Sequence, residues 1–324
     1  MKAIVCHQYG SPDVLELQDV DKPTVKDDDV LVRVHAASVN PLDWHSMTGK
    51  PYLLRIGALR RPKRPILGVD VAGQVEAVGK NVTQFQPGDD VFGAGYGAFA
   101  EYLCAPEDKL VLKPANLTFE QAAAVPVAGL SALQGLRDRG RIQSGQRVLI
   151  NGASGGVGTF AVQIAKSFGT EVTGVCSTRN VGLVRSIGAD HVVDYTQDNF
   201  TQSGQRYDLM LDTVGSRSLS ECRRVLNPKA VYVSVGAKMG DWIGPLTHIS
   251  KVLLASLFGS QKMAPMLARI TKEHLVVLQG LLEAGKVTPV IGRRYELSEV
   301  PEALRHQGER HAQGKTVINV AGPG

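Results

Sequence analysis

The sequence is poor in cysteine and in aromatic residues, and it has no long uninterrupted apolar run. Its four cysteines include no pair at C-x-x-C spacing, so we expect neither a disulfide framework nor a structural zinc cluster. The most apolar stretch, Ala122–Leu133, is broken by Pro126 and Gly129 and is too short to span a membrane. The opening residues, "MKAIVCHQYG", form a strand-like pattern without the apolar segment of a signal peptide. These absences favour a reducing, cytoplasmic location.

A strong excess of charge of either sign is also lacking. The 36 basic and 31 acidic residues give a net charge of +5. The one concentrated basic run, Arg55–Arg64, is interpreted as a solvated loop, with an anionic-ligand or nucleic-acid patch as the alternative. Because no motif of a nucleic-acid-binding fold accompanies this run, nucleic acid is not an expected partner. The length of 324 residues permits two domains.

The pattern of apolar residues changes along the chain. In the first third, "DDVLVRVHAASVN" (Asp28–Asn40) and "VDVAGQVEAVG" (Val69–Gly79) alternate with period two between Gly and Pro turns, which predicts a small barrel or sandwich. From about Ala122 the pattern becomes helix, strand, glycine loop, helix and strand in regular succession. That succession predicts a parallel, doubly wound sheet.

The last third changes again, to an amphipathic helix at 272–287 and strands at 289–297 and 315–320. These elements could close the first domain from the other side. We therefore predict a catalytic domain that begins with residues 1–124 and ends with 271–324, and a cofactor domain over 125–270.

A glycine cluster lies between the strand "RVLIN" and the helical pattern "VGTFAVQIAKSF". It aligns with the G-x-G-x-x-G loop, whose backbone N–H groups and helix N-terminus bind a dinucleotide diphosphate. Alanine replaces the first glycine of that loop, and a tight turn without a ligand is the alternative interpretation. The predicted contacts of the loop are Ala153, Ser154, Gly155, Gly156, Val157 and Gly158.

The second strand of this unit, "EVTGVC", predicts which dinucleotide binds. NAD-preferring proteins hold the ribose 2′-hydroxyl with an acid at the end of this strand. Here Glu171 lies at the wrong end, and the carboxyl end is followed by Ser177, Thr178 and Arg179. Hydroxyl and guanidinium groups are donors that suit a 2′-phosphate, so we predict NADP(H). The alternative for Arg179 is a solvated arginine at the start of a helix.

Several segments together resemble the medium-chain dehydrogenase/reductase superfamily, and most closely its zinc-free quinone oxidoreductase branch. The segments are "NPLDWHSMTG", "LGVDVAGQVEAVGKNVTQFQPGDDVFG", "AAAVPVAGLSALQGL", "NGASGGVG" and "GKTVINV", and the resemblance covers nearly the whole chain. It implies an α/β protein with a GroES-like, β-rich catalytic domain built from both chain ends and a doubly wound Rossmann cofactor domain. It also suggests a homodimer, by analogy only.

The resemblance implies further site residues. It places Asn40 beside the nicotinamide and the segment of Val127 and Ser131 beneath that ring, and it suggests Tyr195 near the adenine or the 2′-phosphate. The complete set of cofactor contacts that it implies outside the glycine loop is Asn40, Val127, Ser131, Ser177, Arg179, Tyr195, Val214, Gly236 and Lys315.

One departure from the wider superfamily concerns zinc. The zinc alcohol dehydrogenases carry a ligand cysteine where Asn40 stands, and Gly-His-Glu where this chain has Gly68-Val69-Asp70. Valine cannot bind a metal, and catalytic zinc needs three protein ligands. We therefore expect no zinc.

Without a Lewis acid, hydride transfer to a conjugated C=C bond or to a quinone is easier than oxidation of an unactivated alcohol. The candidate catalytic residues are Asn40, Asp43, His45 and Tyr52. Asn40 could instead be a turn residue, and Asp43 is expected to hold a loop or the ribose. His45 and Tyr52 could donate a proton or merely line a wall, and bulk water could supply the proton equally well.

The sequence thus predicts an NADPH-dependent, zinc-independent reductase of α,β-unsaturated carbonyls or quinones. One alternative is an alcohol dehydrogenase. Another is a non-enzymatic dinucleotide-binding scaffold that docks on a membrane or RNA, which the pI near 9.0 and the apolar run Ile249–Ser260 permit. We interpret that run as packing at a domain or subunit interface, and we expect no stable membrane insertion.

Overall fold

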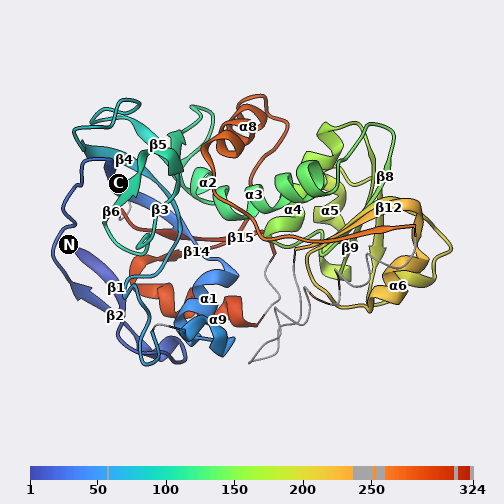
Figure 1. Ribbon diagram of the computed structural model, residues 1–324, viewed down its shortest axis with the longest axis horizontal. Helices are drawn as coiled ribbons and strands as arrows, with labels where there is room; N and C mark the ends of the chain where they lie inside the picture. The colour runs from blue at the N-terminus through green and yellow to red at the C-terminus, as the bar shows by residue number, and fades with distance from the viewer. Residues whose placement is uncertain (57, 236–249, 251, 253–259, 310–312, 322–324) are drawn as a thin grey trace. The chain divides into compact units, whose positions relative to one another are not determined.

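The structure is a computed structural model that describes residues 1–56, 58–235, 250, 252, 260–309 and 313–321. The chain forms two compact units (Figure 1). The first unit comprises Met1–Ala128, Ile270–Gly285 and Pro289–Gly324, and the second comprises Gly129–Arg269 and Lys286–Thr288. Gly236 and most of the apolar run 249–260 lie outside the described residues.

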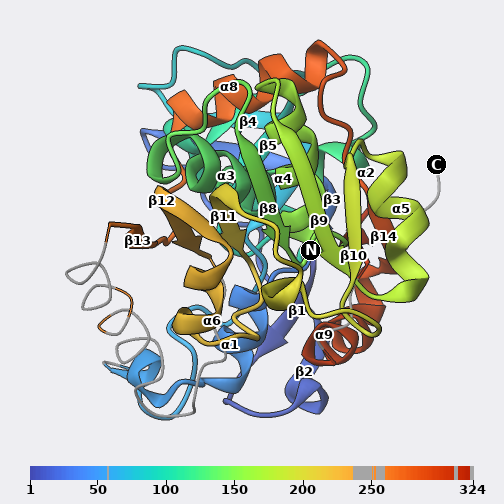
Figure 2. The ribbon, with the colours of Figure 1, turned by 90° about the vertical axis from the view of Figure 1, so that its right-hand side faces the viewer.

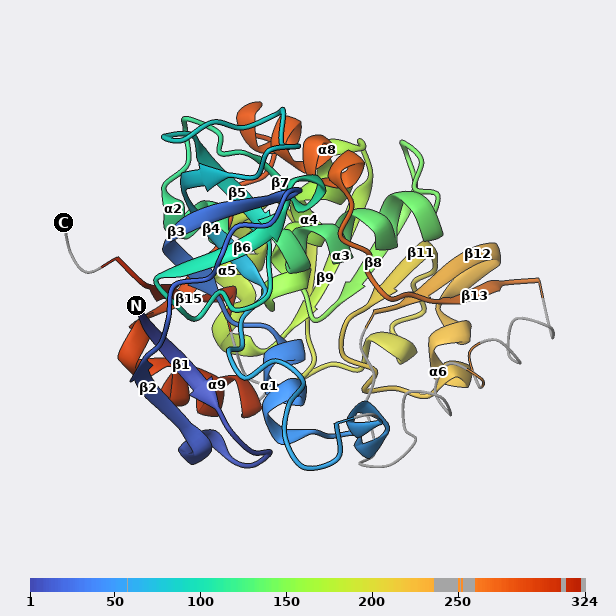
Figure 3. The same cartoon turned by 60° about the vertical axis from the view of Figure 1, so that its left-hand side comes forward.

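The first unit is built on a seven-stranded sheet in the order β14-β15-β3-β4-β5-β7, with β6 paired to β3. A separate antiparallel pair, β1 and β2, precedes it in the chain. The last strand, β15, runs antiparallel to β3 with Val317 opposite Ser38, so the end of the chain extends the sheet of the first third (Figure 3). The strands are β1 (Lys2–Cys6), β2 (Leu15–Asp19), β3 (Asp29–Ser38), β4 (Asp70–Val78), β5 (Asp90–Ala94), β6 (Tyr102–Pro106), β7 (Leu110–Leu112), β14 (Ile291–Glu296) and β15 (Lys315–Asn319).

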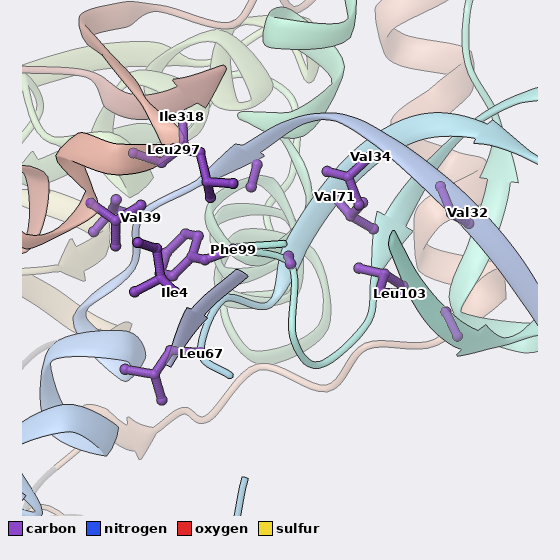
Figure 4. Close-up of a cluster of buried hydrophobic side chains, with 14 of the residues drawn as sticks. Ile4, Val32, Val34, Val39, Leu67, Val71, Phe99, Leu103, Leu297 and Ile318 are labelled. Carbon is purple, nitrogen blue, oxygen red and sulfur yellow. The ribbon is translucent and has the colours of Figure 1, made fainter. Parts of the chain in front are cut away.

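The core of this unit follows from the alternation in its strands. Val30, Val32 and Val34 of β3 are at most 1% exposed, because every second side chain of a strand points to the same face. Figure 4 shows Val34 beside Val71, and Ile4 beside Phe99. The helices of the unit are α1 (Pro41–Thr48), α2 (Phe119–Ala123), α8 (Lys272–Glu283) and α9 (Val300–Gly308), and α3 (Pro126–Leu133) runs on into the second unit.

The second unit contains a six-stranded sheet in the order β10-β9-β8-β11-β12-β13, and every neighbouring pair is parallel (Figure 2). The chain fills one half of the sheet outward from β8 and then returns to fill the other half. Right-handed crossovers place the helices of the two halves on opposite faces. The sequence-predicted doubly wound fold is therefore confirmed. Its elements are β8 (Arg147–Asn151), α4 (Gly156–Ser167), β9 (Glu171–Cys176), α5 (Val181–Ser186), β10 (His191–Asp194), β11 (Tyr207–Asp212), α6 (Leu219–Arg224), β12 (Leu226–Ser234) and β13 (Lys262–Pro265).

Short helical turns complete the described chain: η1 (Pro12–Val14), η2 (Tyr52–Arg55), η3 (Glu107–Lys109), the π-helical η4 (Gln134–Arg139), η5 (Thr178–Asn180), η6 (Phe200–Gln202) and η7 (Leu297–Glu299). Within the described residues, none of the helices has both the length and the apolar character that a membrane crossing requires.

Candidate active site

The glycine loop joins β8 to α4 in the second unit. Gly152 has a φ of +87°, a conformation that favours glycine, and the N–H groups of Gly152 and Ala153 both donate to the Val175 carbonyl at 3.1 and 3.0 Å. Gly155 is the N-cap of α4. The first-turn N–H groups of an α-helix have no acceptor within the helix, and together with the helix dipole they form a site for an anion such as a diphosphate.

The two remaining glycines of the motif differ in what surrounds them. A Cβ on Gly158 would lie 2.0 Å from the Gly152 carbonyl oxygen, so Gly158 is required by the fold of the loop itself. A Cβ on Gly155 would meet only that same oxygen, at an ordinary 3.5 Å. The chain alone therefore leaves room for a side chain at Gly155, and a bound diphosphate would fill that room.

Alanine at the first glycine position is explained by a glycine on the neighbouring strand. Ala153 is fully buried, and a Cβ added to Gly174 of β9 would come within 2.9 Å of the Ala153 Cβ. Gly174 thus makes the space that Ala153 occupies. The departure from G-x-G-x-x-G leaves the loop shape intact.

The carboxyl end of β9 carries the residues predicted to hold a 2′-phosphate. Ser177 is half-buried, and Thr178 and Arg179 are exposed on η5. Strand β9 carries no acid at this end, but Asp194 of the neighbouring β10 lies there. The Thr178 hydroxyl donates to Asp194 Oδ2 at 2.5 Å, and this bond is the main cause that lowers the pKa of Asp194.

Strand β9 itself ends without an acid, as the sequence shows, but the neighbouring β10 brings Asp194 to the same edge of the sheet. Asp194 lies opposite Cys176 in the parallel register, and carboxyl ends of neighbouring parallel strands meet at one edge of the sheet. The Thr178 hydroxyl is committed to Asp194 and is not available to a phosphate. Ser177 and Arg179 are the other two residues predicted to contact the 2′-phosphate. Tyr195, half-exposed at 50%, follows Asp194 at the same edge.

A buried carboxylate organises the neighbouring strand ends of the second unit. Asp212, at the end of β11, is 0% exposed and accepts from Asn151 Nδ2 at 2.9 Å and from the Tyr232 hydroxyl at 2.8 Å. It also accepts the N–H groups of Val214 and Gly215, at 3.0 and 2.9 Å. These bonds fix the loop that carries Val214, which the sequence analysis assigned to the cofactor.

In the first unit a second group of polar residues is buried where three strands meet. Ser38 ends β3, Asp70 begins β4 and Lys315 begins β15, while Asn40 is the N-cap of α1. Asp70 Oδ2 accepts from Ser38 Oγ at 2.7 Å, Asn40 Nδ2 at 2.9 Å and Lys315 Nζ at 3.3 Å. We call these four residues, with Asp43, the buried polar cluster.

Lys315 is the cation of the buried polar cluster. It is 4% exposed, and its ammonium donates to Asn40 Oδ1 at 2.7 Å and to the Val39 carbonyl at 3.0 Å. The second oxygen of Asp70 accepts the N–H of Val127, at the start of α3, at 3.0 Å. A buried ion pair is costly unless its polar groups have hydrogen-bond partners, and this network supplies partners to both oxygens of Asp70 and to the ammonium of Lys315.

Asn40 is bound on both sides of its amide group, by Lys315 at the oxygen and by Asp70 at the nitrogen, and it is 1% exposed. In this geometry it fixes the start of α1. Of the two residues assigned to the segment of α3, Ser131 is 6% exposed and Val127 is half-buried.

Asp43 holds the backbone at the start of α1. Its carboxylate accepts the backbone N–H of Asn40 at 2.8 Å, and the side chain is 2% exposed. Burial raises the pKa of Asp43 to about 7, and the nearby Asp70 adds to this effect, while the bond from Asn40 and the charge of Lys315 oppose it.

The other two catalytic candidates lie after Asp43. His45, on α1, has its Nδ1 2.7 Å from the Lys50 carbonyl oxygen. Tyr52, on η2, is half-buried and lies beneath the Arg55 guanidinium, which is 4.8 Å from the ring centroid. Arg55 also donates to the Thr48 and Gly49 carbonyls, both at 3.0 Å, and so stabilises the end of α1.

The basic run 55–64 is therefore only partly a free charged surface. Arg64 stacks on Tyr96 with 3.4 Å to the ring centroid, while Arg60, Arg61 and Lys63 are exposed. This arrangement favours the interpretation as a solvated loop.

The residues at the zinc-ligand positions do not fit zinc. Val69 is a buried apolar side chain, and Asn40 and Asp70 are both bonded to the ammonium of Lys315. The Lys315 ammonium is the positive charge bonded to Asn40 and Asp70, and none of the three residues Asn40, Val69 and Asp70 is a thiolate or an imidazole. Over the described part of the chain, no three His, Cys, Asp or Glu side chains are grouped as a metal site requires.

Two family models match parts of the chain. Residues 26–115 match the family model described as the alcohol dehydrogenase GroES-like domain, and residues 187–318 match the one described as zinc-binding dehydrogenase. The Mus musculus protein named NAD(P)H oxidoreductase RTN4IP1, mitochondrial, is 34% identical over 99% of this chain and 89% of its own length.

Two further relatives cover nearly the whole chain. The 2-methylene-furan-3-one reductase of Solanum lycopersicum is 34% identical over 98% of this chain and 79% of its own length. The solved structure of the quinone oxidoreductase from Coxiella burnetii matches with a TM-score of 0.87 and 31% identity over 99% of both chains. The family resemblance of the sequence is thereby confirmed: the chain belongs to the quinone oxidoreductase branch of the medium-chain dehydrogenase/reductase superfamily.

Proposed function

We propose that this protein is an NADPH-dependent reductase of α,β-unsaturated carbonyls or quinones that needs no zinc. The observation that carries the proposal is the anion site of the second unit. A positive-φ glycine loop leads to the free N–H groups of α4, with room at Gly155 for a diphosphate. Ser177 and Arg179 at the end of β9 then provide donors for a 2′-phosphate.

The residues at the zinc-ligand positions of the first unit support hydride transfer to an activated substrate. The nicotinamide group, when bound, supplies the hydride. An alkoxide would need a Lewis acid, and the zinc-ligand positions hold Asn40, Val69 and Asp70 instead. A conjugated C=C bond or a quinone is already electrophilic, so the protein has only to hold the substrate and exclude water.

The proton that completes the reduction has two sources in this proposal. Asn40 and Asp43 hold the start of α1 and are engaged within the protein. We assign the protonation of the substrate enolate to Tyr52, half-buried on η2, or to a water molecule. His45 has its Nδ1 2.7 Å from the Lys50 carbonyl oxygen, a contact that fixes the orientation of its ring.

The names of the relatives support the same reading. One is a 2-methylene-furan-3-one reductase, one a quinone oxidoreductase, and one an NAD(P)H oxidoreductase. We extend the proposal to a cytoplasmic homodimer that acts on a small-molecule substrate.

The test is a panel of candidate substrates, in which turnover is monitored by the loss of NADPH absorbance. We expect turnover of small enals, enones or quinones with NADPH and no oxidation of simple alcohols with NADP⁺. Turnover of alcohols alone would favour the alcohol dehydrogenase alternative. Binding of NADPH without any turnover over the full panel would favour the non-enzymatic scaffold.

A further inference from the structure

Asn180 joins the two anion-binding segments of the second unit. It ends η5 and is 5% exposed. Its side-chain Nδ2 donates to Ser154 Oγ in the glycine loop at 3.0 Å and to Ser177 Oγ after β9 at 3.2 Å. One buried amide group thus contacts both the loop predicted to hold the diphosphate and the strand end predicted to hold the 2′-phosphate.

The chemistry of the amide decides what the two serines can do. An amide nitrogen has two hydrogens and only donates, so each serine oxygen here accepts. A hydroxyl whose oxygen accepts one bond still has its own hydrogen to donate. Ser154 and Ser177 are therefore both turned into donors toward a further acceptor, and phosphate oxygens accept only.

A purely local role for Asn180 has less support. Asn180 precedes α5 (Val181–Ser186), where an asparagine commonly caps a helix. Its side chain makes no such capping bond, and both hydrogens of its Nδ2 are directed at the serines. The side chain is thus committed to the two serines.

We propose that Asn180 is a positioning residue that sets Ser154 and Ser177 as donors and thereby contributes to the preference for NADPH over NADH. It does not touch the cofactor in this proposal but acts through the two hydroxyls. The inference rests on the proposed function, because it presupposes that an NADP-type dinucleotide binds the second unit.

The experiment is a double-mutant cycle on cofactor binding. The dissociation constants of NADPH, NADH, 2′,5′-ADP and 5′-AMP are measured for the parent, Asn180→Ala, Ser177→Ala and the double variant. We expect Asn180→Ala to lower the ratio of NADPH to NADH affinity about fivefold, within the range of one hydrogen bond. Because Asn180 affects the NADPH to NADH affinity ratio through Ser177, the double variant should lower that ratio little more than Ser177→Ala alone.

The fragments separate the two segments. The affinity ratio of 2′,5′-ADP to 5′-AMP reports the 2′-phosphate alone, and it should fall in parallel with the ratio for the whole cofactors. Asn180→Asp keeps the size of the side chain but accepts the serine hydrogens, so it should weaken NADPH further than Asn180→Ala does. That variant carries the test if Asn180→Ala fails to fold.

Asn199→Ala is the matched control. Asn199 caps η6 in the same unit by accepting from the N–H and hydroxyl of Thr201, so its loss should leave both ratios unchanged. Independent, additive losses in the double variant, or unchanged ratios in folded Asn180 variants, would overturn the positioning role. A parent protein that binds neither dinucleotide would instead overturn the proposed function on which it rests.

Discussion

Replacing Lys315 by methionine removes the cation of the buried polar cluster at nearly constant side-chain length. The ammonium lies 3.3 Å from Asp70 Oδ2, and both side chains are almost fully buried, at 4% and 0% exposure. At an effective dielectric constant of about 20, Coulomb's law gives roughly 5 kcal/mol for charges at this separation. Removing one partner of a buried pair typically costs about 3–5 kcal/mol, because the other charge stays buried.

The remaining contacts of Asp70 place the expected loss at the lower end of that range. Ser38, Asn40 and the Val127 N–H still donate to the carboxylate after the substitution. We therefore expect Lys315→Met to lower the free energy of unfolding by about 3 kcal/mol. Adding Asp70→Asn removes the orphaned charge, and the double variant should recover about 2 kcal/mol of that loss.

The assay is urea unfolding followed by circular dichroism, applied to the parent, the two single variants and the double variant. Lys80→Met is the control, because Lys80 pairs with Asp27 on the surface of the same unit, with side chains 72% and 60% exposed. That exposed pair should contribute less than about 1 kcal/mol. A Lys315→Met variant as stable as the control, or a double variant that shows the plain sum of the single losses, would refute the reasoning.

Three further predictions concern single residues. The pKa of Asp43, raised to about 7 from an ordinary 3.8, means that the folded protein binds this proton more tightly than the unfolded chain, so stability should fall as pH rises across that interval. The contribution of Asp43 to the slope should reach at most about 1.4 kcal/mol per pH unit and should be missing in Asp43→Asn. Urea titrations at several pH values measure the difference between the two slopes, and equal slopes would contradict the assignment. Gly155→Val should keep the thermal unfolding midpoint but weaken NADPH binding, whereas Gly158→Val should unfold, and a Gly155→Val protein with parental NADPH affinity would mean that the loop is only a turn. Arg179→Ala should raise the KM for NADPH about tenfold with little change in the KM for NADH, and equal losses for both cofactors would remove the main support for NADP. Asp194→Asn should lower the KM for NADPH, because it removes a negative charge beside Thr178.

The fold could be predicted from the sequence because it depends on short-range periodicity. Alternation in Val30, Val32 and Val34 predicts a half-buried strand, and the succession of strands and helices after Ala122 predicts the parallel sheet. The glycine loop could be located because its spacing is local. The loop needs glycine at Gly158 but leaves room for a side chain at Gly155, and this difference depends on three-dimensional contacts that the spacing does not show.

The parts that sequence reasoning missed depend on long-range pairing. The sequence assigned Lys315 to the cofactor and did not predict its bonds to Asp70 and Asn40, which join residues separated by 245 and 275 positions. No periodicity encodes such a contact. Its only signal was the pattern of one basic and one acidic residue at the starts of two strands of the same sheet.

Asp194 and Asn180 were missed for a different reason. Asp194 ends the third strand, whereas the motif places its acid on the second strand, and the ends of parallel strands share one edge. Asn180 follows Arg179 at the start of a helix, where an asparagine commonly acts as a helix cap. Its contacts with Ser154 and Ser177 show instead that it links two segments.

The central claim is that the chain reduces an activated substrate with NADPH and without a metal. The most direct measurement is the rate of NADPH oxidation with a small enone or quinone, before and after exhaustive chelation. Because Asn40, Val69 and Asp70 stand at the zinc-ligand positions, with Lys315 bonded to two of them, the rate should not change. A loss of activity on chelation that added zinc restores would contradict the account.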